Sequence, residues 1–302
     1  MQWVILSHNC TFKANSFQYK SMKSTQELEK IASQVRRDIV RQVHLANSGH
    51  PGGSLGCADF LVALYFRQMT IQADLFKMDG VNEDLFFLSN GHISPAFYSV
   101  LSRVGYFEIA ELNTFRKINS RLQGHPTTHE KLPGVRIASG SLGQGISVAI
   151  GAALSKKMLK DNHLVYCLCG DGEMEEGQIW EAIMYAGAKK VDNIIVTVDV
   201  NLQQIDGSVE HVLPYGDLRP KFESFGWTVL EMNGNKMQST IETLDTAKTL
   251  CGKGKPVCIL MKTEMGQGVD FMMGSHKWHG IAPNAEQTEK ALAQLQETLG
   301  DF

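Results

Sequence analysis

Short apolar runs alternate with longer amphipathic segments along most of the chain. The runs that have the length and the β-branched or aromatic content of buried strands are 84–88, 164–169, 194–200, 228–232 and 256–262. Segments with helical spacing or composition are 24–44, 57–69, 93–104, 107–118, 145 to about 160, 176–190, 237–252 and 284–299, with a loop and helix at 213–225. Because strands alternate with helices, the pattern predicts an α/β fold, with a mostly parallel sheet covered by helices on both faces.

Several loops between these elements are rich in glycine and proline. The glycines and proline of segment 49–53 disfavour a helix and predict a tight loop around His50. Segment 119–138 is polar, contains prolines and lacks periodicity, so we interpret it as a functional loop. The glycines of 139–145 precede a helix and would let the backbone approach a ligand closely.

Composition indicates a globular protein. Of the 302 residues, 43% are hydrophobic and 20% are charged. The net charge of −3 and the lack of any apolar run near the roughly 20 residues of a membrane span predict neither nucleic acid nor membrane as a partner. Residues 1–21 lack a signal-peptide layout, and Met22 precedes a strong helix pattern. We therefore expect an N-terminal extension at 1–22, disordered or a non-native start, followed by one domain at 23–302.

The six cysteines show no C-x-x-C spacing. Cys167 and Cys169 alternate on a predicted strand, so both side chains should face the same side of the sheet. This usage is typical of reduced, buried thiols and predicts a cytoplasmic protein rather than a metal or redox site.

Segment 164–207 is the most informative stretch. A buried strand ends at Gly170-Asp171-Gly172, a helix follows, and a second strand ends at Asn201. This is a βαβ unit, so Asp171 and Asn201 should leave the sheet side by side at its carboxyl edge, where open α/β sheets bind ligands. A carboxylate, an amide oxygen and backbone carbonyls suit Mg²⁺, which completes its coordination with phosphate oxygens and water. The sequence therefore predicts a diphosphate bound through a divalent cation.

Histidines occur in similar loop contexts at several places. His50, His92, His125 and His276 each lie in a loop that contains glycine or proline. A single such histidine is more often structural than catalytic, but the repetition of the context indicates a shared site. The spacing His276-x-x-His279 leaves a metal site as an alternative.

The Gly-Asp-Gly motif followed by Asn201 resembles the thiamine diphosphate motif, and the string GDGEMEEGQIWEA…DVNLQQIDG resembles transketolase over about residues 24–300. The resemblance implies thiamine diphosphate with Mg²⁺ or Ca²⁺ as cofactors. It also implies catalytic residues, metal ligands and cofactor contacts: His50, His92, His125 and His276 toward sugar hydroxyls and protons; Asp171, Asn201 and the Gln203 carbonyl on the metal; His92, Gly140, Leu142, Gly172, Glu181, Asn201 and His276 along the cofactor; His279 as a second family histidine; and Glu176 at a subunit interface.

Full-length members of that family continue with a pyrimidine-binding domain and a third domain. This chain ends at Phe302. We therefore expect the N-terminal subunit of a split transketolase, active only with a C-terminal subunit that completes the site for sugar phosphates. We also expect a homodimer of this chain within a heterotetramer, with Glu176 and the methionine-rich segment 265–273 as candidate interface elements.

Other interpretations stay open from the sequence. The Gly-Asp-Gly motif is shared by 1-deoxyxylulose-phosphate synthase-like enzymes and by the α subunit of 2-oxoacid dehydrogenases. The histidine contexts disfavour both, because decarboxylation of a 2-oxoacid does not need that many contacts to sugar hydroxyls. A non-catalytic scaffold that only binds the cofactor is a further alternative.

Overall fold

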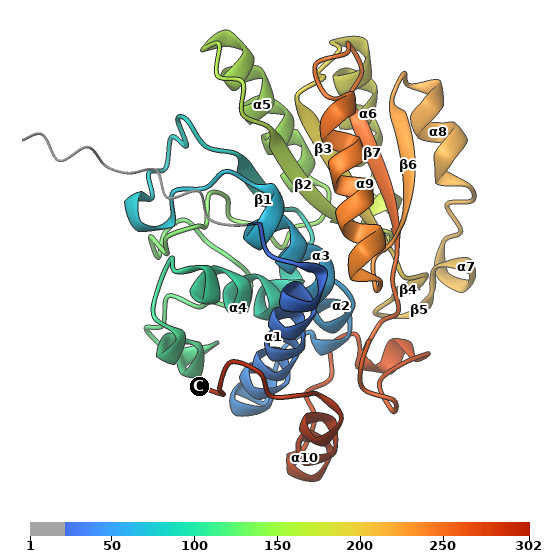
Figure 1. Ribbon diagram of the computed structural model, residues 1–302. Helices are drawn as coiled ribbons and strands as arrows, with labels where there is room; N and C mark the ends of the chain where they lie inside the picture. Colours follow the sequence, from blue (N-terminus) through green and yellow to red (C-terminus); the bar gives the residue numbers. More distant parts are fainter. Residues whose placement is uncertain (1–21) are drawn as a thin grey trace, which may run out of the picture.

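The computed structural model describes residues 22–302, and the expected extension at 1–22 lies outside them except for Met22. Its centre is a five-stranded sheet in which every neighbouring pair is parallel (Figure 1). In spatial order the strands are β1 (Leu85–Leu88), β2 (Val165–Gly170), β3 (Ile194–Val200), β7 (Val257–Lys262) and β6 (Thr228–Asn233). The predicted α/β class is confirmed, and each predicted strand is present within about one residue of its expected bounds.

Helices cover both faces of this sheet (Figure 1). On one face lie α1 (Thr25–Ala46), α3 (Ala58–Ala63), α4 (Ser94–Val104) and α9 (Met237–Leu250). On the other lie α5 (Gln144–Met158), α6 (Gly177–Ala188) and α8 (Leu218–Ser224). Successive strand residues enter opposite cores, as the period of two requires. Cys167 and Cys169 accordingly face the same core, with their Sγ atoms 3.9 Å apart.

The segment after His50 is helical, which corrects the predicted loop. Helix α2 (Pro51–Gly56) begins with proline at its first turn, where the missing N–H is not needed. Its glycines serve packing rather than a turn, since a Cβ on Gly52 would lie 2.5 Å from Met265 Cγ. The expected helix at 57–69 is α3 followed by a π-helical turn, Leu64–Gln68.

Two other helices are shorter than predicted, and several short elements were not predicted. Segment 107–118 contains only the 3₁₀ helix Ile109–Thr114, and the last helix is α10 (Ala285–Gln294). Segment 119–138 contains neither helix nor strand, as expected. The remaining elements are a hairpin of β4 (Gln203–Gln204) and β5 (Gly207–Ser208), helix α7 (Val209–Val212), and 3₁₀ turns at Ala73–Leu75, Gly91–Ile93, Gly172–Glu175 and His276–Trp278.

Within residues 22–302, none of the helices combines the length and the apolar character needed to cross a membrane.

Candidate functional site

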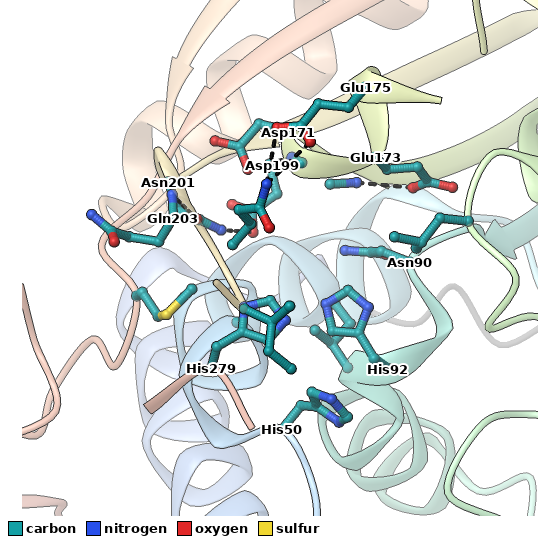
Figure 2. A pocket seen from close by; sticks show the side chains of 18 of the residues that line it. His50, Asn90, His92, Asp171, Glu173, Glu175, Asp199, Asn201, Gln203 and His279 are labelled. Atoms are coloured by element: carbon teal, nitrogen blue, oxygen red, sulfur yellow. Dashed lines mark hydrogen bonds between the residues drawn. The ribbon is translucent and has the colours of Figure 1, made fainter. Parts of the chain in front are cut away.

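A pocket of about 300 Å³ opens at the carboxyl ends of the central strands. Figure 2 shows acids and amides on one side of it and three histidines on the other. The lining residues are His50, Gly53, Asn90, His92, Ile93, Gly140, Leu142, Gly170, Asp171, Gly172, Glu173, Glu175, Glu176, Asp199, Asn201, Gln203, Gln204, Ile205, Met265 and His279.

Asp171 and Asn201 lie together in this pocket, as the βαβ unit predicts. Strand β2 pairs with β3 up to Gly170, which lies opposite Asp199. The two strands therefore end at the same edge of the sheet. The Asp171 carboxylate is buried and accepts hydrogen bonds from Gly172 N at 2.9 Å and from Leu202 N at 2.6 Å. The bond from Leu202 ties the turn after β3 directly to the turn after β2.

The turn after β3 has a strained residue. Leu202 adopts a left-handed conformation, with φ of 62°, which is uncommon for a residue with a side chain. The Gln203 N–H donates to Asn201 Oδ1 at 2.9 Å, closing a small loop around the amide. Gln203 also lines the pocket.

A second buried carboxylate, Asp199, was missed from the sequence. It lies two residues before Asn201, near the end of β3, and the Asn201 Nδ2 donates to Asp199 Oδ2 at 2.9 Å. Burial, together with the neighbouring charge of Asp199, raises the pKa of Asp171 to about 7. A divalent cation beside the two carboxylates would reverse this shift, because it favours their ionised form.

The charge of the pocket disfavours an anion that binds without a cation. Carboxylates of Asp171, Glu173, Glu175, Glu176 and Asp199 line it, and none of the described lining residues is a lysine or arginine. A diphosphate would be repelled here unless a divalent cation offset that charge. Among residues 22–302 there is no metal-type cluster of three or more His, Cys, Asp or Glu side chains. One carboxylate with amide and carbonyl oxygens instead fits Mg²⁺ that shares its coordination with phosphate.

Three histidines form a compact cluster opposite the acids (Figure 2). The ring centroids of His50 and His92 are 5.1 Å apart, and those of His92 and His279 are also 5.1 Å apart. His125 lies beside the cluster, 6.1 Å from His50. Burial is the main cause that lowers the pKa of each of the four rings, to about 4 for His50. The neighbouring histidines or Arg116 contribute to the lowered pKa of His50, His92 and His125. The rings are therefore neutral near pH 7.

His279 occupies the place in this cluster that the sequence pattern gave to His276. His276 begins a 3₁₀ turn and is absent from the pocket lining, whereas His279 follows the turn and lines the pocket. Both residues belong to one short string, GSHKWHG, so spacing alone could not separate them. The distinction comes from where the turn places each ring.

The predicted cofactor contacts divide into two groups. Gly140, Leu142 and Gly172 line the pocket. A Cβ on Gly140, whose φ is 138°, would lie 2.8 Å from the His125 ring, so glycine permits this close approach. Glu181, in contrast, is exposed on α6 and outside the pocket lining.

Two further polar residues of the pocket carried no recognised signal. Glu173 is buried and accepts hydrogen bonds from Ser89 Oγ at 2.5 Å and from Gly143 N at 2.7 Å, joining β1 to the start of α5. Asn90 is buried, and its Oδ1 has no hydrogen-bond partner within the described part of the chain. An unpaired buried oxygen facing a pocket indicates space for a ligand donor.

A parallel α/β sheet with a pocket at the carboxyl ends of its strands is typical of a ligand- or cofactor-binding domain. The family profile of the transketolase thiamine diphosphate binding domain matches residues 27–300, and the chain belongs to that family.

Similar proteins fall into two length classes. An apulose-4-phosphate transketolase subunit of Phocaeicola vulgatus is 38% identical over 90% of this chain and 95% of its own length. A 6-deoxy-6-sulfo-D-fructose transketolase subunit of a Clostridium species is 35% identical over 90% of this chain and 97% of its own length. The crystal structure of Campylobacter jejuni transketolase matches with a TM-score of 0.83 and 34% identity, over 90% of this chain. This chain covers only 43% of that protein, and 44% of human transketolase, which is 32% identical.

Proposed function

We propose that this chain is the thiamine-diphosphate-binding subunit of a split transketolase. Together with a C-terminal partner subunit, it would transfer a two-carbon ketol unit between ketose and aldose phosphates. The observation that carries this proposal is the pocket itself, which combines a cation-requiring acidic edge with a cluster of neutral histidines. A 2-oxoacid decarboxylase would have less use for such a set of proton-moving and hydroxyl-binding groups.

The acidic edge supplies cofactor binding. Asp171, the Asn201 amide oxygen and the Gln203 carbonyl would hold Mg²⁺ or Ca²⁺, and Gly140, Leu142 and Gly172 would lie along the cofactor. When bound, thiamine diphosphate supplies a carbon nucleophile and an electron sink, while the protein supplies position and electrostatics.

The histidine cluster supplies proton movement and orientation. A neutral imidazole accepts a proton at one nitrogen and donates at the other, so His50, His92 and His279 can bind sugar hydroxyls and exchange protons with them. The buried Nδ1 atoms of His50 and His279 have no hydrogen-bond partner among residues 22–302, which leaves them available to a substrate. His125 would contact the substrate beside His50, and we propose that His276 contributes from outside the cluster.

The names of the relatives and the exposed apolar side chains of this chain support a multi-subunit assembly. Three relatives that this chain covers almost completely are named as transketolase subunits rather than as whole transketolases. Helices α5 and α6 pack together and leave apolar side chains exposed: Val148, Met158 and Leu159 on or just after α5, and Met184 and Tyr185 on α6. We propose that this surface forms the contact between two copies in a heterotetramer, with Glu176 at its edge. The segment 265–273 contributes less, because Met265 and Met272 are buried.

The cellular location forms part of the proposal. The five cysteines that the structure describes are free, and four of them are buried. Such thiols suit a reducing compartment, so we propose that the protein works in the cytoplasm.

A coupled assay tests the proposal. The chain is co-purified with the C-terminal subunit, supplied with thiamine diphosphate and Mg²⁺, and offered ketose and aldose phosphates. Ketol transfer by the pair, and none by either chain alone, is the expected result. Release of CO₂ from a 2-oxoacid without ketol transfer would assign it to the decarboxylating enzymes, and cofactor binding without turnover in any pairing would leave a scaffold.

A further inference from the structure

Asp199 lies directly behind the proposed metal ligand Asn201. It is the penultimate residue of β3 and only 2% of its surface is exposed. One of its oxygens accepts from Asn201 Nδ2 at 2.9 Å, and the other accepts from Thr263 Oγ1 at 2.5 Å. Both oxygens are thus engaged by protein donors.

The Asn201 side chain can serve a cation in only one of its two orientations. Its oxygen attracts a cation, whereas its NH₂ group repels one. Each Asp199 oxygen accepts a hydrogen bond, one of them from the Asn201 NH₂ group, so Asp199 binds the NH₂ end and turns the amide oxygen away from itself. The Gln203 N–H donates to that oxygen from the turn, in agreement with the same orientation.

We propose that Asp199 is a positioning residue that fixes the Asn201 amide with its oxygen toward the cation of the cofactor. The inference rests on the proposed function, because it presumes a cation at Asp171 and Asn201. Residues behind metal ligands commonly hold them in this way, and their loss weakens metal binding by about 10- to 100-fold.

Two substitutions separate orientation from charge. D199N removes the charge but keeps an oxygen for Asn201, because its new NH₂ group can donate to the Thr263 hydroxyl. D199L has nearly the same shape and removes both charge and acceptor. Mg²⁺ is titrated calorimetrically into the full chain in the presence of excess thiamine diphosphate. We expect D199L to lose about 10- to 100-fold in Mg²⁺ affinity and D199N to lose less than about tenfold.

A second background tests the orientation itself. In N201D the ligand is a carboxylate with two equivalent oxygens, so it has no orientation to fix. We expect that, in the N201D background, D199L and D199N reduce Mg²⁺ affinity by the same factor. E176Q serves as the matched control for charge, since Glu176 lines the same pocket but makes no hydrogen bond to Asn201.

A further pair keeps the proposal testable if D199L does not fold. T263V leaves the Asp199–Asn201 bond intact and should change Mg²⁺ affinity little. Combined with D199N, it removes the hydroxyl that receives the new NH₂ group, which can then turn toward Asn201. We expect the double variant to lose more affinity than the product of the two single losses.

Several outcomes would overturn the inference. Equal losses in D199N and D199L, or a D199L loss that persists in N201D, would show that Asp199 acts by charge. A D199N/T263V double variant whose loss of Mg²⁺ affinity equals the product of the two single losses would also show that Asp199 acts by charge. If Mg²⁺ and thiamine diphosphate fail to bind the unaltered chain, the proposed function fails and takes this inference with it. Normal binding by every Asp199 variant rejects the inference alone.

Discussion

The two sides of the pocket differ in charge: carboxylates line one side and neutral histidines line the other. At the sheet edge, five carboxylates converge, and Asp171 has a raised pKa because it is buried beside Asp199. Across the pocket, half-buried histidines have lowered pKa values and stay uncharged near pH 7. One side concentrates charge that only a cation can balance, and the other excludes charge from the place where protons would move. Burial drives both shifts, because it disfavours the charged form of each group.

The largest expected effect comes from removing the central carboxylate. In D171N the charged metal ligand is lost. The N–H groups of Gly172 and Leu202 each bind a different oxygen of Asp171, and the amide keeps only one of these two acceptors. We expect Mg²⁺ affinity in excess thiamine diphosphate to fall by more than the roughly 10- to 100-fold typical of residues that merely support a ligand. Calorimetry measures this, and a D171N chain that binds Mg²⁺ normally would remove Asp171 from the site.

The next effect distinguishes the two histidines of the string GSHKWHG. H279Q should lower kcat of the reconstituted enzyme by about 100-fold, the lower end of what a proton-transferring group contributes. H276Q is the matched control and should lower kcat by less than about tenfold, because His276 lies outside the pocket lining. The reverse order of the two losses would place His276, and not His279, at the reacting groups.

The pH dependence should reveal the acidic side rather than the histidines. Asp171 must be ionised to bind a cation, and its pKa is raised to about 7, so Mg²⁺ affinity should fall as pH drops through 7, by about tenfold per unit. His50 stays neutral until pH approaches 4. Between pH 5 and 7, excess Mg²⁺ should therefore restore activity, after correction for protonation of the cofactor's own phosphate. Activity at pH 6 that excess Mg²⁺ does not restore would point to a histidine instead.

The smallest effect is expected at Glu181. This side chain is exposed on α6 and does not line the pocket. E181Q should leave Mg²⁺ affinity of the isolated chain within about twofold, as for surface substitutions in general. A larger loss in the isolated chain would show that Glu181 acts on the metal site within one copy of the chain.

The βαβ unit could be predicted because its signals are local. Apolar runs, glycines and a terminal asparagine place Asp171 and Asn201 at one sheet edge by rules of chain geometry alone. The same rules located the loop that carries His125, whereas His50 lies directly before helix α2 and His92 lies in a 3₁₀ turn. The rules do not state which ring of a short string turns inward, and so His276 was favoured over His279.

The residues that were missed depend on tertiary packing. Asp199 lies inside a β-branched run, where nothing in the pattern marks a buried acid that accepts bonds from Asn201 and Thr263. Helix α2 was predicted as a loop because its glycines suggest a turn, although Gly52 is needed to let Met265 pack closely. Both features depend on residues far away in the chain, which local periodicity cannot report.

The most direct test of the whole account is calorimetric titration of thiamine diphosphate into the chain, once in Mg²⁺ and once in a chelator. Since five carboxylates and no lysine or arginine line the described pocket, we predict saturable binding in Mg²⁺ and none in the chelator. Equal affinity in the two conditions would contradict a diphosphate held through a cation at Asp171 and Asn201.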